Sequence, residues 1–91
     1  MVEPRLDAPV LDEPPVSDTL TDYDRLHLIT YLRLLDAAAD NADPDEVASI
    51  VLRIDPKAEP RRARHAYETH LARAQWMTES GYRHLLRDGM N

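Results

Sequence analysis

The sequence has 91 residues, which is enough for one domain with a modest hydrophobic core. It contains no cysteine, so disulfides, thiolate metal sites and thiol nucleophiles are excluded. The formal net charge is -6, but residues 60–91 hold six bases and three acids, so only this part favours a phosphate-binding surface. No apolar stretch has the length of a signal peptide or a membrane-spanning helix. We therefore expect a cytoplasmic protein without a membrane partner.

The N-terminal segment is rich in proline and in acidic residues. Four of the seven prolines lie in the first fifteen residues, and five acids are placed among and just after them. Proline removes backbone donors and like charges repel, so we predict that residues 1–19 form a disordered tail. Residues 20–91 are then the folded domain. The few apolar residues of the tail leave open that it docks on the domain or on a partner.

Residues 21–39 are predicted to form the first helix, with Thr21 as its N-cap. Apolar residues recur after it at spacings of three and four and make two stripes on different sides. A surface helix of a small bundle needs only one buried stripe. The second stripe is therefore either covered by the rest of the domain or available to a partner protein, and it contains Tyr23, Leu26, Thr30 and Leu34.

Two further helices are predicted after the first. Asp43 and Pro44 are an N-cap and a proline at the first helical position, and an amphipathic pattern follows them. Asp55-Pro56 ends this second helix, because a residue before proline is disfavoured in the α conformation. Pro60 begins a longer third helix, which Gly81 ends. No strand-like alternation occurs, so the predicted fold class is all-α.

The second and third helices, with the break between them, indicate a helix-turn-helix in which one helix supports the next. The connection from residue 54 to residue 60 is longer than the usual turn of three or four residues. We therefore predict a small all-α helical domain with an extended-turn helix-turn-helix core.

The start of the third helix offers candidates for DNA binding, because the N-terminus of a recognition helix meets base edges and phosphates. These candidates are Arg61, Arg62 and Arg64. Acidic residues lie nearby in the sequence and would repel the same phosphates, so we expect DNA binding to be weak or absent. In the alternative interpretation, the arginines form a solvated basic face paired with local acids.

The sequence has no Gly-rich phosphate loop, nucleophile motif or metal-binding His pair, since His65 and His70 are five residues apart and do not share a helix face. We expect no catalytic residue, metal, cofactor or small-molecule substrate. His70 falls on the inward stripe of the third helix and is expected to be a hydrogen-bonded core residue. His27 is expected at the surface.

Two aromatic residues near the C-terminus are further candidates for binding a partner. Trp76 is expected to pack against residues that follow Gly81, including Tyr82. The alternative is that Trp76 and Tyr82 anchor a partner protein.

Three segments, residues 31–36, 54–56 and 70–78, resemble the proteobacterial domain-of-unknown-function family numbered 2285, and the resemblance extends from Leu20 to Leu86. It implies an extended-turn helix-turn-helix associated with mobile genetic elements. The family includes one domain of the transcriptional activator FseA and the stand-alone antiactivator QseM.

A short, acidic chain with one domain is similar to the QseM-like antiactivators of that family. The resemblance implies that the protein binds a transcriptional activator of the FseA type, and also opposes a quorum-sensing regulator of the TraR type. Activation of conjugative-transfer genes would then be blocked, with the second stripe of the first helix as the docking face. The alternative is a small DNA-binding helix-turn-helix transcriptional regulator.

Overall fold

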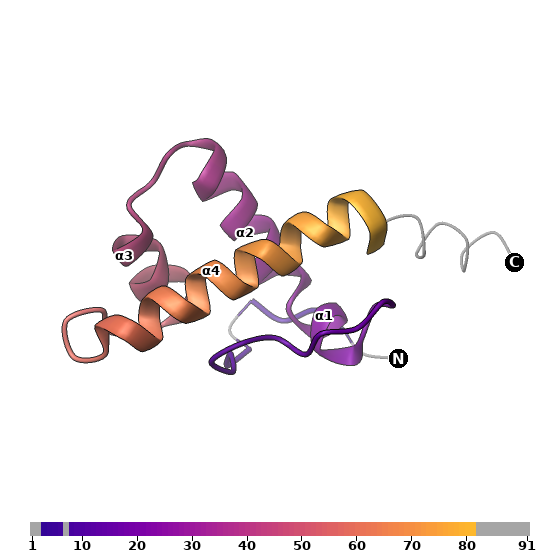
Figure 1. Cartoon of the computed structure of the whole chain (residues 1–91), viewed down its shortest axis with the longest axis horizontal. Coiled ribbons are helices and arrows are strands. Elements are labelled where there is room, and N and C mark those ends of the chain that lie inside the picture. Colours follow the sequence, from indigo (N-terminus) through magenta and orange to yellow (C-terminus); the bar gives the residue numbers. More distant parts are fainter. Residues whose placement is uncertain (1–2, 7, 82–91) are drawn as a thin grey trace, which may run out of the picture.

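The structure, a computed structural model, describes residues 3–6 and 8–81. This part of the chain contains helical segments and no strand, so the predicted all-α class is confirmed (Figure 1). None of its helices is both long enough and apolar enough to cross a membrane. The elements in chain order are α1 (Asp22–Leu26), α2 (Leu28–Ala39), α3 (Pro44–Val47), η1 (Ala48–Leu52), α4 (Pro60–Trp76) and η2 (Met77–Gly81).

The predicted first helix is divided into α1 and α2. Thr21 caps α1 as predicted, and it forms a capping box in which its side chain and that of Asp24 each accept a backbone N–H of the other residue. The helical path is interrupted at His27, whose φ of -101° and ψ of 20° lie outside the α region. The imidazole of His27 stacks on the ring of Tyr23 and lies within 2.8 Å of the Tyr23 carbonyl oxygen. The interruption therefore coincides with a histidine that is held in place from α1.

The second predicted helix begins at Pro44, after Asp43, as expected from the sequence. Neither Asp43 nor another side chain caps it. It continues from α3 into η1, a π-helical turn, and ends at Leu52 instead of at Pro56. The physical cause is Arg53, which adopts the left-handed conformation with φ 60° and ψ 37° and so stops the helix.

The hydrophobic core lies where α4 crosses the other helices. The inner face of α4 is rich in alanine, which lets α2, α3 and η1 approach closely, and α4 packs against all three. In Figure 1, α4 runs the length of the molecule, with α2 and α3 on one side of it and α1 on the other. The arrangement of α3–η1, a turn and α4 is the predicted helix-turn-helix. The buried apolar residues of the core are Tyr31, Leu34, Val47, Ala48, Leu52, Ile54, Ala63, Ala66, Tyr67 and Ala74.

A buried ion pair fixes α4 against α1. Asp24 is fully buried, and its carboxylate accepts hydrogen bonds from Arg73 Nε at 3.1 Å, Arg73 Nη2 at 2.7 Å and the Tyr31 hydroxyl at 3.0 Å. Burial alone would raise the pKa of Asp24. The hydrogen bonds from Arg73, from the Thr21 backbone and from Tyr31, together with the charge of Arg73, outweigh it and hold this pKa below its usual value.

The segment before α1 lies over α1 and beside α4 (Figure 1). Leu11 N donates to the Tyr23 hydroxyl at 3.0 Å, and the carbonyl oxygen of Pro9 lies 2.7 Å from His27 Nε2. Arg73 donates from Nη1 to the Ser17 carbonyl at 2.7 Å and from Nη2 to the Thr19 carbonyl at 3.0 Å. Through these contacts the segment is docked on α1, His27 and α4. The predicted disorder of residues 1–19 in solution stays a prediction.

Candidate nucleic-acid interface

The N-terminal end of α4 is exposed and has no side-chain cap. Pro60 occupies the first helical position, and Glu59 precedes it without capping the helix through its side chain. The first bond of the helix is donated by Ala63 N to the Glu59 carbonyl at 2.9 Å, so the amides of Arg61 and Arg62 precede it at the helix end. The positive end of the helix dipole lies here, which favours an anion such as a phosphate.

The three arginines predicted as DNA-binding candidates lie at this end and differ in their contacts. Arg61 is exposed and makes no ion pair within residues 3–6 and 8–81. Arg64 lies 3.7 Å from a carboxylate oxygen of Asp45 on α3, and half of its side chain remains exposed. Arg62 is held more closely. It contacts Asp12 at 2.6 Å and Glu59 at 3.0 Å, and these contacts raise the pKa of its guanidinium, with the hydrogen bond to Asp12 the largest cause.

The connection between η1 and α4, residues 53–59, is fixed by local hydrogen bonds. Its anchor is Ile54, whose side chain is buried in the core. The Asp55 carboxylate accepts from Lys57 N at 2.9 Å, and the Asp55 carbonyl accepts from Glu59 N at 2.8 Å. The turn therefore presents Arg53 and Lys57 on the surface before α4 begins.

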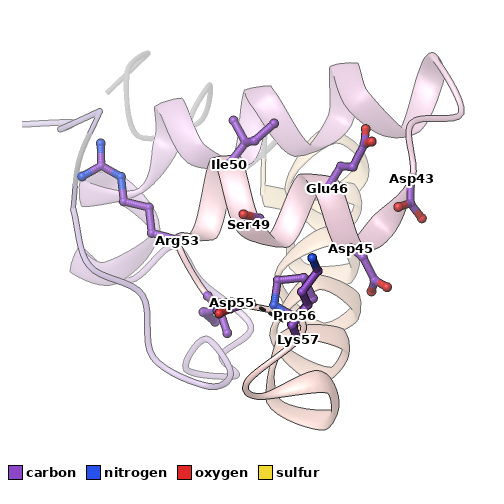
Figure 2. Close-up of a pocket in the computed structure, with 10 residues that line it drawn as sticks. Asp43, Asp45, Glu46, Ser49, Ile50, Arg53, Asp55, Pro56 and Lys57 are labelled. Carbon is purple, nitrogen blue, oxygen red and sulfur yellow. Dashed lines mark hydrogen bonds between the residues drawn. The ribbon is translucent and has the colours of Figure 1, made fainter.

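An open, shallow hollow between α3–η1 and this turn contains charges of both signs (Figure 2). Arg53 lies at one side of it, and Asp43 and Glu46 lie at the opposite side, at the start of α3. The acids that precede α4 in the sequence, on α3 and in the turn, therefore do not surround the N-terminus of α4 evenly. Two of them, Asp45 and Glu59, already contact Arg64 and Arg62, which leaves Arg61 as the free cation of this helix start among the described residues.

The stripe predicted as a docking face is largely interior. Leu34 is fully buried and Thr30 is 2% exposed. The buried face of α2 contains both of them together with Tyr31, so it takes in residues from both predicted stripes. Tyr23 and Leu26 are half-buried. Tyr23 donates its hydroxyl hydrogen to His70 Nε2 at 2.6 Å. These four residues do not form an exposed apolar face.

His70 is buried and hydrogen-bonded, as predicted. Its Nδ1 donates to the Ala66 carbonyl at 2.7 Å, and burial lowers its pKa, which favours the neutral ring that accepts from Tyr23. The prediction for His27 was wrong, because this side chain is 1% exposed, between the Tyr23 and Pro9 carbonyls.

The aromatic candidates near the C-terminus have different outcomes. Trp76 is half-buried, and the guanidinium of Arg73 lies 3.9 Å from the centre of its ring, a cation–π contact. Tyr82 lies outside the described residues. Whether either residue binds a partner stays untested.

Sequence reasoning missed two basic residues of this surface, Arg53 and Lys57. A signal was present, since bases recur at positions 53, 57, 61 and 64 across the predicted break. It was missed because a spacing of three and four residues predicts a shared surface only within a continuous helix, and residue 57 lies in the predicted break. The structure explains it, because the turn presents two of these bases on the surface between η1 and the start of α4.

Comparison with known families decides between the candidate functions. A family model described as "T6SS, Transcription factor, DNA binding domain" matches residues 3–87. The chain belongs to this RovC DNA-binding-domain family. No curated protein matches the chain. The match covers nearly the whole sequence, so the exposed arginines of α4 belong to a domain of a DNA-binding class.

Membership of the RovC family corrects two expectations from the sequence. The identification as a QseM-like antiactivator is wrong, since the family is that of a transcription factor's DNA-binding domain. The expectation that DNA binding is weak or absent, with an activator protein as the partner, is wrong for the same reason. The physical error was to judge affinity from acids that are near in sequence, although the charge that DNA meets is set by the local surface. The alternative, a DNA-binding regulator, agrees with the family.

Proposed function

We propose that this RovC-type domain binds duplex DNA with α4 as its recognition helix and thereby regulates transcription in the cytoplasm, without catalytic activity. The observation that carries the proposal is the match to a DNA-binding family over residues 3–87, in a chain whose longest helix presents arginines at an exposed N-terminus. We further propose that its target genes encode parts of a T6SS, the system named in the family description.

The proposed docking follows the usual geometry of a helix-turn-helix. The N-terminal turns of α4 enter the major groove, which is wide enough for one α-helix. Arg61 and Arg64 are three residues apart and lie on neighbouring positions of the helix surface, from which their guanidinium groups reach base edges or phosphates. The connection before the helix brings Arg53 and Lys57 toward the phosphates at the edge of the groove.

The proposal is tested by measuring binding to a fluorescent duplex of about 20 base pairs at several salt concentrations. The double variant Arg61→Ala/Arg64→Ala should bind at least about tenfold more weakly than the parent, since a good arginine contact to DNA contributes about 1–3 kcal/mol. The slope of log affinity against log salt should become shallower by about one for each phosphate contact removed.

The matched control is Arg33→Ala. Arg33 lies on α2 and lines a different hollow, with Asp36 and Glu46. Its removal lowers the positive charge of the protein at a site away from the proposed interface, so affinity should change by less than about twofold. Circular dichroism establishes that each variant is folded. A parent protein that does not bind duplex DNA at low salt, or arginine variants of α4 that bind as well as the parent, would refute the proposal.

A further inference from the structure

The acidic segment before α1 covers part of the surface that DNA would use. We call residues 8–20 the N-terminal strap. Asp12 contacts Arg62 Nε at 2.6 Å through its carboxylate, and a carboxylate oxygen of Glu13 lies 3.2 Å from His65 Nε2. Pro14, the next residue, is buried. The strap thus places two carboxylates on the first turns of the helix that we assign to DNA recognition.

The contacts of the strap follow one flank of α4. Arg62, His65 and Thr69 succeed one another at spacings of three and four, and the Thr69 hydroxyl lies 3.5 Å from the Asp12 carbonyl oxygen. Arg61 and Arg64 occupy the adjoining exposed face. The strap is therefore beside Arg61 and Arg64, which it does not contact, and directly on Arg62.

An α-helix with its side chains is about 10–12 Å across, and the major groove is about 12 Å wide. A recognition helix therefore fits the groove only when nothing lies along its flank. A strap on Arg62 and His65 would occupy the space of one phosphate backbone, and its carboxylates would repel that backbone. DNA binding by α4 and docking of the strap at these residues exclude each other.

We propose that the N-terminal strap is an autoinhibitory element, which occupies the recognition helix as an acidic mimic of the DNA backbone and must leave Arg62 and His65 before α4 enters the major groove. The proposal rests on the proposed DNA-binding function and adds regulation of the same site. DNA phosphates displace the strap by competing for the same cations, so the apparent affinity is lowered by the fraction of molecules in the docked state.

The construction of the strap suits a reversible contact. Its two ends are anchored in protected places, by the Pro9 carbonyl at the buried His27 and by the Ser17 and Thr19 carbonyls at the buried Arg73. Between these ends Pro14 is buried, whereas the contacts on Arg62 and His65 are made by exposed groups. The side chains of Asp12 and Glu13 are 63% and 65% exposed, and exposed ion pairs are weak and screened by salt. The contacts of Asp12 and Glu13 can therefore break while both ends of the strap stay attached.

The first experiment removes the two contacts without shortening the chain. Asp12→Asn/Glu13→Gln should raise affinity for a duplex by about three- to tenfold at low salt, because each exposed ion pair contributes weakly and two are lost. The matched control is Glu3→Gln/Asp18→Asn, which removes the same charge from the N-terminal region at two exposed positions that make no hydrogen bond or ion pair with α4. A gain shared equally by both variants would show a general charge effect and would overturn the proposal.

The second experiment holds the strap in place. The chain has no cysteine, so Asp12→Cys/Thr69→Cys introduces a single pair of thiols, at two residues that approach within 3.5 Å through the Thr69 hydroxyl and the Asp12 backbone carbonyl. The oxidised, disulfide-linked form should bind DNA at least tenfold more weakly than the same protein after reduction. Equal binding by the two forms would overturn autoinhibition and leave the proposed function intact. Failure of both forms and of the parent to bind DNA would instead refute the proposed function, and the strap proposal with it.

Discussion

The carboxylate of Asp24 has two structural roles. It accepts the Thr21 backbone N–H that completes the capping box of α1, and it pairs with Arg73 on α4. Arg73 in turn donates to two carbonyls of the strap and lies over the ring of Trp76. One buried ion pair thus links α1, α4 and the N-terminal strap, and none of these links could be read from the sequence. Spacing along α4 indicates only that Arg73 lies off the main apolar stripe.

Replacement of Arg73 by methionine should strongly destabilise the fold. The substitution keeps much of the side-chain volume but leaves the fully buried Asp24 without its charge partner, which typically costs about 3–5 kcal/mol. Urea denaturation at neutral pH would measure this loss.

The matched variant is Arg64→Met, which removes a half-exposed arginine and its 3.7 Å contact with Asp45 on the same helix. Its free energy of unfolding should fall by no more than about 1 kcal/mol. Similar losses for the two variants would mean that burial of the Asp24–Arg73 pair does not determine its importance.

At the scale of elements, local signals placed the helix starts correctly. Thr21 caps the first helix, and Pro44 and Pro60 each begin a helix, where capping and proline preferences predict. The ends were less predictable, because His27 and Arg53 interrupt helices through backbone conformations that these residue types do not specify. The division at His27 also affects the stripes: the buried face of α2, with Thr30, Tyr31 and Leu34, does not continue from α1 along one helical pattern over residues 21–39.

The left-handed conformation of Arg53 leads to a prediction about the turn. A non-glycine residue in this region is strained by about 1–2 kcal/mol, and glycine is not. Arg53→Gly should therefore unfold with a free energy roughly 1 kcal/mol higher than Arg53→Ala, which loses the same charge but keeps a Cβ. Thermal or urea denaturation of the pair would measure it. If Arg53→Ala proved as stable as Arg53→Gly, the left-handed turn at this position would be contradicted.

At the scale of the whole molecule, the net charge of -6 conceals the functional surface. Residues 1–20 hold five acids and one arginine, and two of those acids contact side chains of α4. The sequence of α4 itself has four arginines and one glutamate. Acidic and basic parts that are separate in the sequence are therefore in contact in the fold. The helix-turn-helix and its arginines could be predicted from the sequence, whereas the cover that the strap places on them required the structure.

The central claim, that α4 is the DNA-recognition helix, is tested most directly by mapping amide chemical-shift changes on addition of a duplex. The largest changes should fall on the connection at residues 53–59 and on the first turns of α4, from Arg61 to Thr69. The amides of Asp12 and Glu13 should move with them, since the strap is displaced. Changes centred on the exposed side of α2, around Leu32, or on the acidic start of α3, with α4 unaffected, would contradict the claim.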